Sequence, residues 1–235
     1  MSPSTHRPTI VDHFQASTRE ILEILDRLVR LDTPTGNAAA IGRFVGEYRR
    51  LLEETGMGCE EIDGPGGPLL HAFRDPEAGR EPPIVLVGHS DTVWPTGEAE
   101  RRPPRLEGNR FFGPGAFDMK CGLAVVVAAL RWLRETGWRL RRPLSVFVSP
   151  DEEVGSVTAH AHAERLIPPE ATALVLEPPL PDGSLKAWRK GVGMYRLEVR
   201  GREAHAGNEP ELGVNAIVEL SRKVLEVSGW TDSGR

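Results

Sequence analysis

The chain has 235 residues, of which 39% are apolar and 27% charged, and its formal net charge is −5. This composition is typical of a soluble globular protein long enough for one domain and part of another, and no apolar run approaches the length of a membrane span. An acidic balance without a dominant basic stripe argues against nucleic acid as a partner.

The first part of the chain alternates helical and strand patterns. Apolar residues recur every three or four positions over 21–29 and 38–55, which predicts two helices with one buried face each. Shorter segments predict strands over 59–62, 69–74 and 83–88. The last of these is wholly apolar and suits a central strand buried on both faces.

The alternation continues through the middle of the chain. We expect helices over 119–136 and 157–166, and strands over 144–148 and 173–176. Strands that alternate with helices predict an α/β domain with a mostly parallel central sheet flanked by helices.

A different pattern begins near Lys186. The segment 195–200 alternates apolar and polar residues with period two, which predicts a strand with one solvated face, and 213–227 predicts a helix. We therefore expect two domains, 1–184 and 185–235, of which the second is the start of a smaller α+β domain.

Histidine and carboxylate side chains follow the predicted central strands at the point where each strand ends. One further aspartate lies in a glycine-rich turn before the helix over 119–136. The residues concerned are His89, Asp91, Asp118, Glu152, Glu153 and Glu177. Because ligands of open α/β sheets bind outside the carboxyl ends of the strands, we expect these side chains to share one crevice.

A group of carboxylates in a cleft needs a compensating charge. Like charges in a low dielectric repel, so some must protonate or be neutralised by a cation, and Lys120 is the only obvious lysine nearby. Mixed histidine and carboxylate ligation predicts a divalent metal, with zinc first and manganese or cobalt as alternatives. Asp91 is placed to accept a hydrogen bond from the far nitrogen of His89.

Each of these residues also has a purely structural interpretation. A histidine at a strand end can be an ordinary buried polar residue, Asp118 an N-cap of the following helix, and Glu177 a loop acid. Only their joint placement favours a functional site over these alternatives. The other histidines in this part of the chain receive no functional role: His71, His160 and His162.

The two cysteines indicate the cellular compartment. Cys59 and Cys121 are too few for a disulfide framework and suit a reducing compartment, and we expect Cys121 to be a small packed residue at the start of its helix. Because the N-terminus lacks the apolar stretch of a signal peptide, we expect a cytoplasmic protein.

Five short motifs resemble those of one enzyme family. In chain order they are VGHSDTVWP, GPGAFDMKCG, SPDEEVG, LVLEP and GREAHAG. They resemble the two-metal aminoacylase/carboxypeptidase family of metallopeptidases, which includes glutamate carboxypeptidase, acetylornithine deacetylase and succinyl-diaminopimelate desuccinylase. The Val-Trp-Pro of the first motif is most similar to the glutamate carboxypeptidase branch.

The resemblance implies a set of metal ligands. It makes His89 and Glu177 ligands of one metal, and Glu153 a ligand of the other. It makes Asp118 the bridge between the two metals, at a position where the family often has a cis peptide bond to the next residue. The implied cofactors are two divalent ions.

The resemblance also implies a reaction. Asp91 would orient His89, and Glu152 would be the general base that moves a proton from water to the leaving amine. His205, in the second domain, would reach the carbonyl oxygen of the substrate, typically in the partner subunit of a homodimer. The implied reaction cleaves the amide of a C-terminal amino acid, with glutamate as one candidate, or of an N-acylated amino acid.

Two departures from the family matter. Cys121 stands where the family usually has glycine, so tighter packing beside Asp118 is expected. Family members also run well beyond 235 residues, where they supply a final histidine ligand and often an arginine that grips the substrate, so we expect a C-terminally truncated form. The alternatives are an inactive metal-binding fragment or interaction module and, more narrowly, a deacylase instead of a carboxypeptidase.

Overall fold

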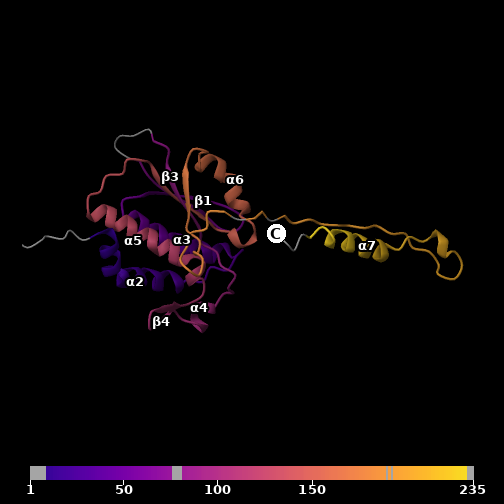
Figure 1. Cartoon of the computed structure of the whole chain (residues 1–235). Helices are drawn as coiled ribbons and strands as arrows, with labels where there is room; N and C mark the ends of the chain where they lie inside the picture. Colours follow the sequence, from indigo (N-terminus) through magenta and orange to yellow (C-terminus); the bar gives the residue numbers. More distant parts are fainter. Residues whose placement is uncertain (1–8, 76–80, 189, 192, 232–235) are drawn as a thin grey trace, which may run out of the picture. The chain divides into compact units, whose positions relative to one another are not determined.

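The computed structural model describes residues 9–75, 81–188, 190–191 and 193–231 (Figure 1). The chain divides into two compact units, Met1–Ser184 and Leu185–Arg235, and each is described by itself. Within the described ranges, no helix is both long enough and apolar enough to cross a membrane.

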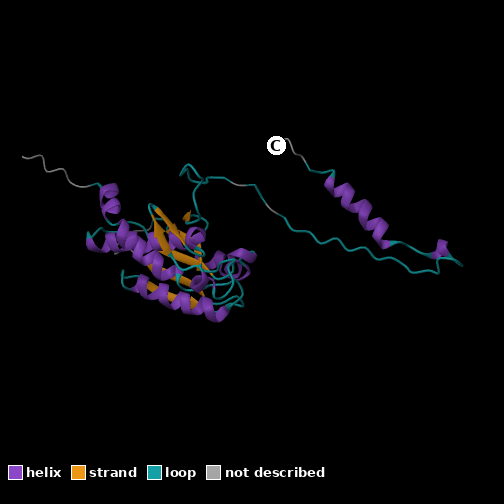
Figure 2. Ribbon diagram, turned by 90° about the horizontal axis from the view of Figure 1, so that it is seen from below, coloured by secondary structure: helices purple, strands orange, loops and turns teal. Residues whose placement is uncertain are grey.

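The first unit is built on a five-stranded sheet, drawn in orange in Figure 2. Its strands are β1 (Gly58–Ile62), β2 (Leu69–Arg74), β3 (Ile84–His89), β6 (Leu144–Ser149) and β7 (Thr172–Val175). They lie in the order β1-β2-β6-β3-β7, with β6, β3 and β7 parallel. Since β2 runs antiparallel to both β1 and β6, it alone opposes the common direction. The predicted α/β fold with a mostly parallel sheet is confirmed.

Alternation along the strands places the core on both faces of this sheet. Every residue of β6 is buried, with Val146 and Val148 in one cluster and Phe147 in the other. The first cluster includes side chains of α2, α3 and α5, and the second includes Ala159 of α6. The helices of the unit are α1 (Ile10–Ala16), α2 (Thr18–Val29), α3 (Ala38–Glu53), α4 (Glu98–Arg101), α5 (Cys121–Glu135) and α6 (Val157–Leu166).

Some short elements were not predicted from the sequence. Helix α1 begins with a capping box, in which Thr9 and Asp12 hydrogen-bond to each other's main-chain N–H groups. Helix α4 and a hairpin of β4 (Arg105–Glu107) and β5 (Arg110–Phe112) lie in a segment for which the sequence predicts no helix or strand. These elements are too short to show a clear apolar period.

The second unit contains one long helix, α7 (Ala216–Ser228). The side-chain oxygen of Asn215 caps it by accepting hydrogen bonds from the N–H groups of Ile217 and Val218, at 3.0 and 3.1 Å. The strand predicted over 195–200 is wrong, because these residues are not in a strand. A strand needs a neighbour for its N–H and C=O groups, and in the described part of this unit the ladder is limited to one bridge, Arg202–Val214.

Candidate metal centre

The predicted side chains meet at the carboxyl ends of three parallel strands. His89 is the last residue of β3, Glu152 follows the end of β6, and Glu177 follows the end of β7. Because β6, β3 and β7 are adjacent and parallel, their carboxyl ends share one edge of the sheet.

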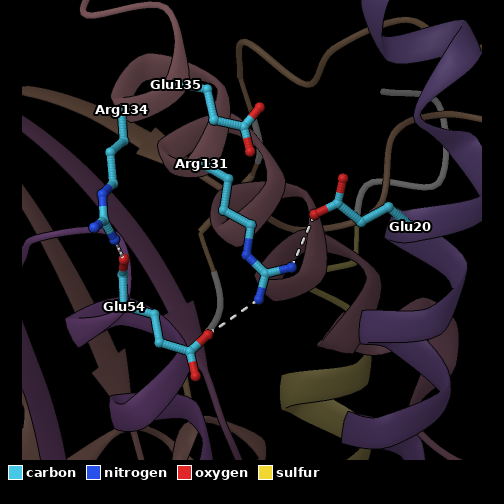
Figure 3. A pocket seen from close by; sticks show the side chains of 5 residues that line it. All are labelled: Glu20, Glu54, Arg131, Arg134 and Glu135. Atoms are coloured by element: carbon cyan, nitrogen blue, oxygen red, sulfur yellow. Dashed lines mark hydrogen bonds and ion pairs between the residues drawn. The ribbon is translucent and has the colours of Figure 1, made fainter.

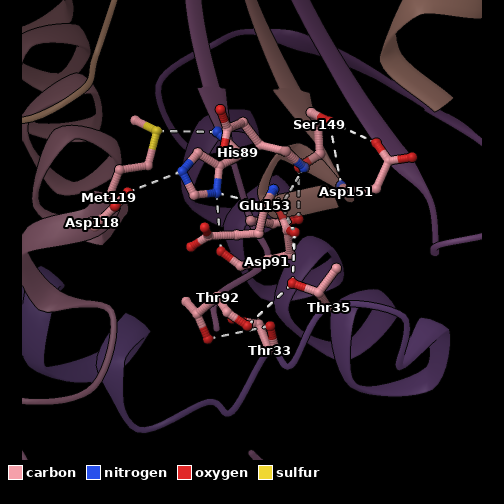
Figure 4. A network of polar contacts seen from close by, with 12 residues as sticks. Thr33, Thr35, His89, Asp91, Thr92, Asp118, Met119, Ser149, Asp151 and Glu153 are labelled. Carbon is pink, nitrogen blue, oxygen red and sulfur yellow. Dashed lines mark hydrogen bonds and ion pairs between the residues drawn. The ribbon is translucent and has the colours of Figure 1, made fainter. Parts of the chain in front are cut away.

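His89 lies at the centre of the group, between Asp118 and Asp91 (Figure 4). Its imidazole is 1% exposed, and Nε2 lies 3.1 Å from Asp118 Oδ1 and 3.3 Å from Glu177 Oε1. On the other side, Nδ1 lies 3.0 Å from the main-chain oxygen of Asp91 and 3.3 Å from its carboxylate. The carbonyl is therefore the nearer acceptor for an Nδ1 hydrogen, and this contact orients the ring with Nε2 toward the acids.

The acids change the proton affinity of His89. Burial alone would lower the pKa of the imidazolium, but the carboxylates of Asp91 and Glu177 outweigh burial and raise the pKa to about 11. Desolvation and the neighbouring acids raise the pKa of both Glu152 and Glu153. The crevice therefore favours bound positive charge.

Asp91 does more than face the imidazole. Its Oδ1 accepts a hydrogen bond from the N–H of Glu152 at 3.0 Å, and its Oδ2 accepts one from the N–H of Glu153 at 3.2 Å. The Thr35 hydroxyl donates to Oδ2 at 2.9 Å (Figure 4). Asp91 thus orients the histidine chiefly through its carbonyl group, and its buried carboxylate holds the turn that carries both glutamates.

That turn explains why two adjacent glutamates can serve one site. Successive residues of an extended strand point to opposite faces, but the residues Glu152–Val154 form a single 3-10 turn directly after β6 and Pro150. Asp151 stays out of the group, because its buried carboxylate accepts from the Ser149 hydroxyl at 3.0 Å and from the N–H of Thr158 at 2.7 Å. Asp151 is a structural residue at the start of α6.

Asp118 lies in an irregular turn, Ala116–Lys120, immediately before α5. Its φ and ψ angles are −115° and 100°, its peptide bond to Met119 is cis, and α5 begins only at Cys121. The alternative interpretation of Asp118 as the N-cap of this helix is therefore wrong. Its side chain is 55% exposed and free to take part in the group around His89.

Lys120, the lysine expected near the acids, points elsewhere. Its ammonium group donates to the carbonyl of Leu31 at 2.6 Å and lies 5.1 Å from the centre of the Phe44 ring. Burial lowers the pKa of Lys120 to about 7. Lys120 therefore braces the turn behind Asp118 and does not compensate the carboxylates.

The first residue of α5 also differs from what the sequence predicts. Cys121 is exposed instead of packed, so it does not tighten the helix start. The close approach is made by Gly122, where a Cβ atom would lie 2.3 Å from the carbonyl oxygen of Leu176, the residue before Glu177. Gly122 thus lets α5 lie directly against the strand end that carries Glu177.

The donor atoms fall into two groups that fit a metal ion. The ligand atoms of His89, Glu152 and Glu177 lie within 4.8 Å of one another, and so do those of His89, Asp118 and Glu153. One imidazole with several carboxylates is a donor set for zinc and related divalent ions. These groups share His89, whereas the resemblance makes Asp118 the shared ligand.

His205 belongs to the second unit and is exposed. Its Nδ1 accepts hydrogen bonds from the N–H groups of Gly207 and Asn208, both at 3.1 Å, so its Nε2 is the nitrogen left for a substrate. The role assigned to His205 remains a prediction from the resemblance.

A cavity of about 540 Å³ lies away from the metal-ligand group, between α2, the end of α3 and α5 (Figure 3). Four of its five lining residues pair with one another, all but Glu135. Arg131 bonds Glu20 at 2.8 Å and Glu54 at 3.2 Å, and Arg134 bonds the main-chain oxygen of Glu54. The cavity is thus lined by a cross-link between helices and not by groups poised for chemistry.

Comparison with known proteins places these features in a wider group. The profile of peptidase family M20/M25/M40 matches residues 85–234. The chain is 31% identical over 229 residues to carboxypeptidase G2 from Pseudomonas sp. (strain RS-16), which covers 94% of this chain and 55% of the relative. It is 30% identical over 210 residues to succinyl-diaminopimelate desuccinylase from Alkalilimnicola ehrlichii, covering 84% of this chain and 54% of the relative.

Solved structures show the same fold at lower identity. Aminopeptidase PepT from Bacillus cereus superposes with a TM-score of 0.64 at 22% identity, covering 88% of this chain and 56% of that one. Human carnosine dipeptidase 1 gives a TM-score of 0.61 at 15% identity, covering 72% and 41%. The chain spans about half the length of the first two relatives.

Proposed function

The chain belongs to peptidase family M20/M25/M40, and from that premise we propose that its first unit holds the metal site of a hydrolase of peptide or N-acyl amide bonds. We propose the same roles for the site residues as the sequence motifs imply. The proposed metal ligands are His89, Asp118, Glu153 and Glu177. They would bind two divalent ions, for which zinc is the first candidate.

The convergence on His89 carries this proposal. Acids from the turn before α5 and from the end of β7 lie within 3.3 Å of its Nε2, and the adjacent strand end contributes Glu152 and Glu153. A buried imidazole surrounded by carboxylates is costly as a purely structural device, but it is a suitable ligand set for a divalent cation.

The bound ions would supply Lewis acidity, which acidifies water and polarises the scissile carbonyl. Glu152 takes the proton from water and returns it to the leaving amine. Without bound ions, desolvation and the acids around Glu152 raise its pKa, and the positive charge of the ions would lower the pKa again. Asp91 keeps the Glu152 main chain in place while Glu152 moves the proton.

The substrate class follows from the relatives. Carboxypeptidase G2 and succinyl-diaminopimelate desuccinylase are named for cleaving amides of amino acids. We propose a C-terminal or N-acylated amino acid as the substrate here. As the resemblance implies, His205 would donate a hydrogen bond to the developing oxyanion, typically in the active site of the partner subunit.

The experiment combines metal analysis with a turnover assay. Wild-type chain, Glu152→Gln and Glu153→Gln are measured by mass spectrometry for metal content and with folyl-glutamate and N-acyl-glutamate for hydrolysis. We expect Glu152→Gln to keep its metal and lose about 10²–10⁴-fold in kcat/KM, because only proton transfer is removed. We expect Glu153→Gln to lose metal as well.

Glu164→Gln is the matched control, since Glu164 is an exposed acid of α6 outside the group. Loss of metal in Glu152→Gln, or full turnover in it, would contradict its role as the base. A wild-type chain that binds metal without hydrolysing either substrate would instead favour an inactive metal-binding fragment or an interaction module.

Location and assembly are part of the proposal. Both cysteines are free thiols in this structure, which suits a cytoplasmic protein. A homodimer through the second unit is proposed from the resemblance, and the exposed apolar side chains of α7 are consistent with it. Light scattering on a size-exclusion column tests the assembly.

A further inference from the structure

A small pocket opens directly beside the metal-ligand group. Its volume is about 250 Å³, and Asp118 and Glu153 form part of its lining. Pockets that enclose a whole drug-sized ligand measure about 300–1,000 Å³, so this one has room for a single side chain. Because two of the proposed metal ligands line it, whatever occupies it also lies at the reacting bond.

The rest of the lining is mainly apolar. Val93 and Trp94 from the segment after β3, and Phe117 from the turn that carries Asp118, belong to it. Val93 is 68% exposed and Phe117 69% exposed, so these side chains are not used by the core of the unit. Apolar side chains gathered in the open beside a polar centre are typical of a binding site.

Trp94 packs against an arginine side chain. The guanidinium of Arg102 lies 4.1 Å from the centre of the Trp94 ring and pairs with the buried carboxylate of Glu98. Glu98 also pairs with Arg101, so two arginines share its carboxylate, and Arg102 acts as a support for the indole. An aromatic ring fixed in this way loses little freedom on binding a ligand.

Charge decides which ligand group fits. None of the described residues that line the pocket is a lysine, an arginine or a histidine. At the apolar end of the pocket, around Val93, Trp94 and Phe117, a carboxylate would leave water without gaining a cationic side chain as partner, whereas an uncharged apolar group would lose nothing. The pocket therefore selects against acidic side chains.

We propose that this pocket is a specificity subsite that binds an uncharged apolar side chain, aromatic or branched, next to the scissile amide. The inference rests on the proposed function for the position of that amide. The inference goes further by naming the class of substrate side chain. In it, Val93, Trp94 and Phe117 determine which side chain is accepted. An acidic residue of the substrate is bound elsewhere.

Equilibrium binding tests this without requiring turnover. The probes are N-acetyl-L-phenylalanine, N-acetylglycine and N-acetyl-L-glutamate, titrated by calorimetry into the full chain with zinc and without it. We expect the phenylalanine probe to bind about tenfold or more tightly than the glycine probe in both states, since the pocket is formed by protein groups. The glutamate probe gains nothing over glycine from this pocket.

Phe117→Ala and Val93→Ala should each reduce the phenylalanine-to-glycine ratio several-fold, and the double variant should bring it near one. Both side chains are mostly exposed, so these variants should keep the fold. Leu106→Ala is the matched control, because Leu106 is 54% exposed on β4 and outside the lining. Trp94→Phe tests whether the bound probe lies beside Trp94. This variant should lose the ligand-induced quenching of tryptophan fluorescence but still bind the probe.

The outcomes separate the two proposals. Equal affinity for all three probes, or a preference that survives in the double variant, overturns the subsite whatever the metal content. A chain that shows the preference but neither binds metal nor hydrolyses amides overturns the proposed function and keeps the pocket as an apolar side-chain site. A chain that hydrolyses amides without the preference overturns the subsite alone.

Discussion

The two units of the chain differ in how far the apolar side chains of their helices are buried. In the first unit α3 packs its apolar face inward, and Phe44 is fully buried. In the second unit α7 buries none of its residues, and Ile217 and Leu225 are 77% and 73% exposed. Both helices are nevertheless regular and begin with an asparagine cap, Asn37 or Asn215.

The difference shows that a helix is specified locally and a strand is not. A helix makes its hydrogen bonds within itself, so α7 forms without a buried face. The segment 195–200 has the right period for a strand, yet it has no partner in the described part of its unit, and Tyr195 is 97% exposed. By contrast β6, fully buried, is bonded to β2 on one side and β3 on the other.

The largest effect is expected when a substitution in the core is compared with one in α7. Phe44→Ala should lower the free energy of unfolding by about 3–5 kcal/mol, because it opens a cavity among buried side chains. Leu225→Ala, at an exposed position, should change it by less than about 0.5 kcal/mol. Urea denaturation followed by circular dichroism measures both. A comparable loss in the two variants would mean that α7 is buried in solution.

The next test concerns tight packing in the first unit. Gly122→Ala should cost about 1–3 kcal/mol in unfolding free energy, because the new Cβ collides with the carbonyl of Leu176. It should also weaken metal binding about 10–100-fold, since Glu177 follows that carbonyl. Gly46→Ala in α3 is the control, because its Cβ would meet no atom within 4 Å. Unchanged metal affinity in Gly122→Ala would contradict the positioning of Glu177 by this contact.

A third test addresses the support of Asp91. Thr35→Val removes the hydroxyl that donates to Asp91 Oδ2 and should weaken metal binding by about 1 kcal/mol. Thr35→Ser keeps a donor and should restore most of the affinity. Calorimetric titration with zinc measures both, and equal losses in the two variants would point to packing of the threonine methyl group instead.

In the second unit the corresponding test is the cap of α7. Asn215→Ala removes the acceptor for two main-chain N–H groups and should destabilise this helix by about 1 kcal/mol. Because α7 buries no residue, nothing else compensates, and amide hydrogen exchange over 216–228 should accelerate. Zinc affinity should not change. Unaltered exchange would show that α7 is held by contacts other than its own cap.

The smallest expected effect is a pH dependence in the first unit. Burial lowers the pKa of His71 below its usual 6.5, so the unfolded chain binds more protons than the folded chain in that window. The free energy of unfolding should therefore fall as pH drops below about 6.5, by less than about 1.4 kcal/mol per pH unit from this residue. His71→Gln should have a shallower slope between pH 7 and 5. Identical slopes in urea titrations would contradict this.

Much of the site could be predicted from the order of strands and polar residues. His89, Glu152 and Glu177 follow consecutive apolar runs, and the geometry of a parallel sheet brings such positions together. Thr35, Lys120 and Gly122 could not be found in this way. They act through contacts between segments distant in sequence, such as 35 with 91, 120 with 31 and 122 with 176, which no local period records.

The hydrogen bonds around Asp91 also decide which replacement this position can accept. Each carboxylate oxygen receives a main-chain N–H, from Glu152 or Glu153. Asparagine has the same shape, but whichever way its amide is turned, an NH₂ group must face a donor that has no lone pair to offer. Asp91→Asn is therefore not an isosteric probe of the histidine alone, since it also removes one of the two hydrogen bonds that attach the turn with both glutamates.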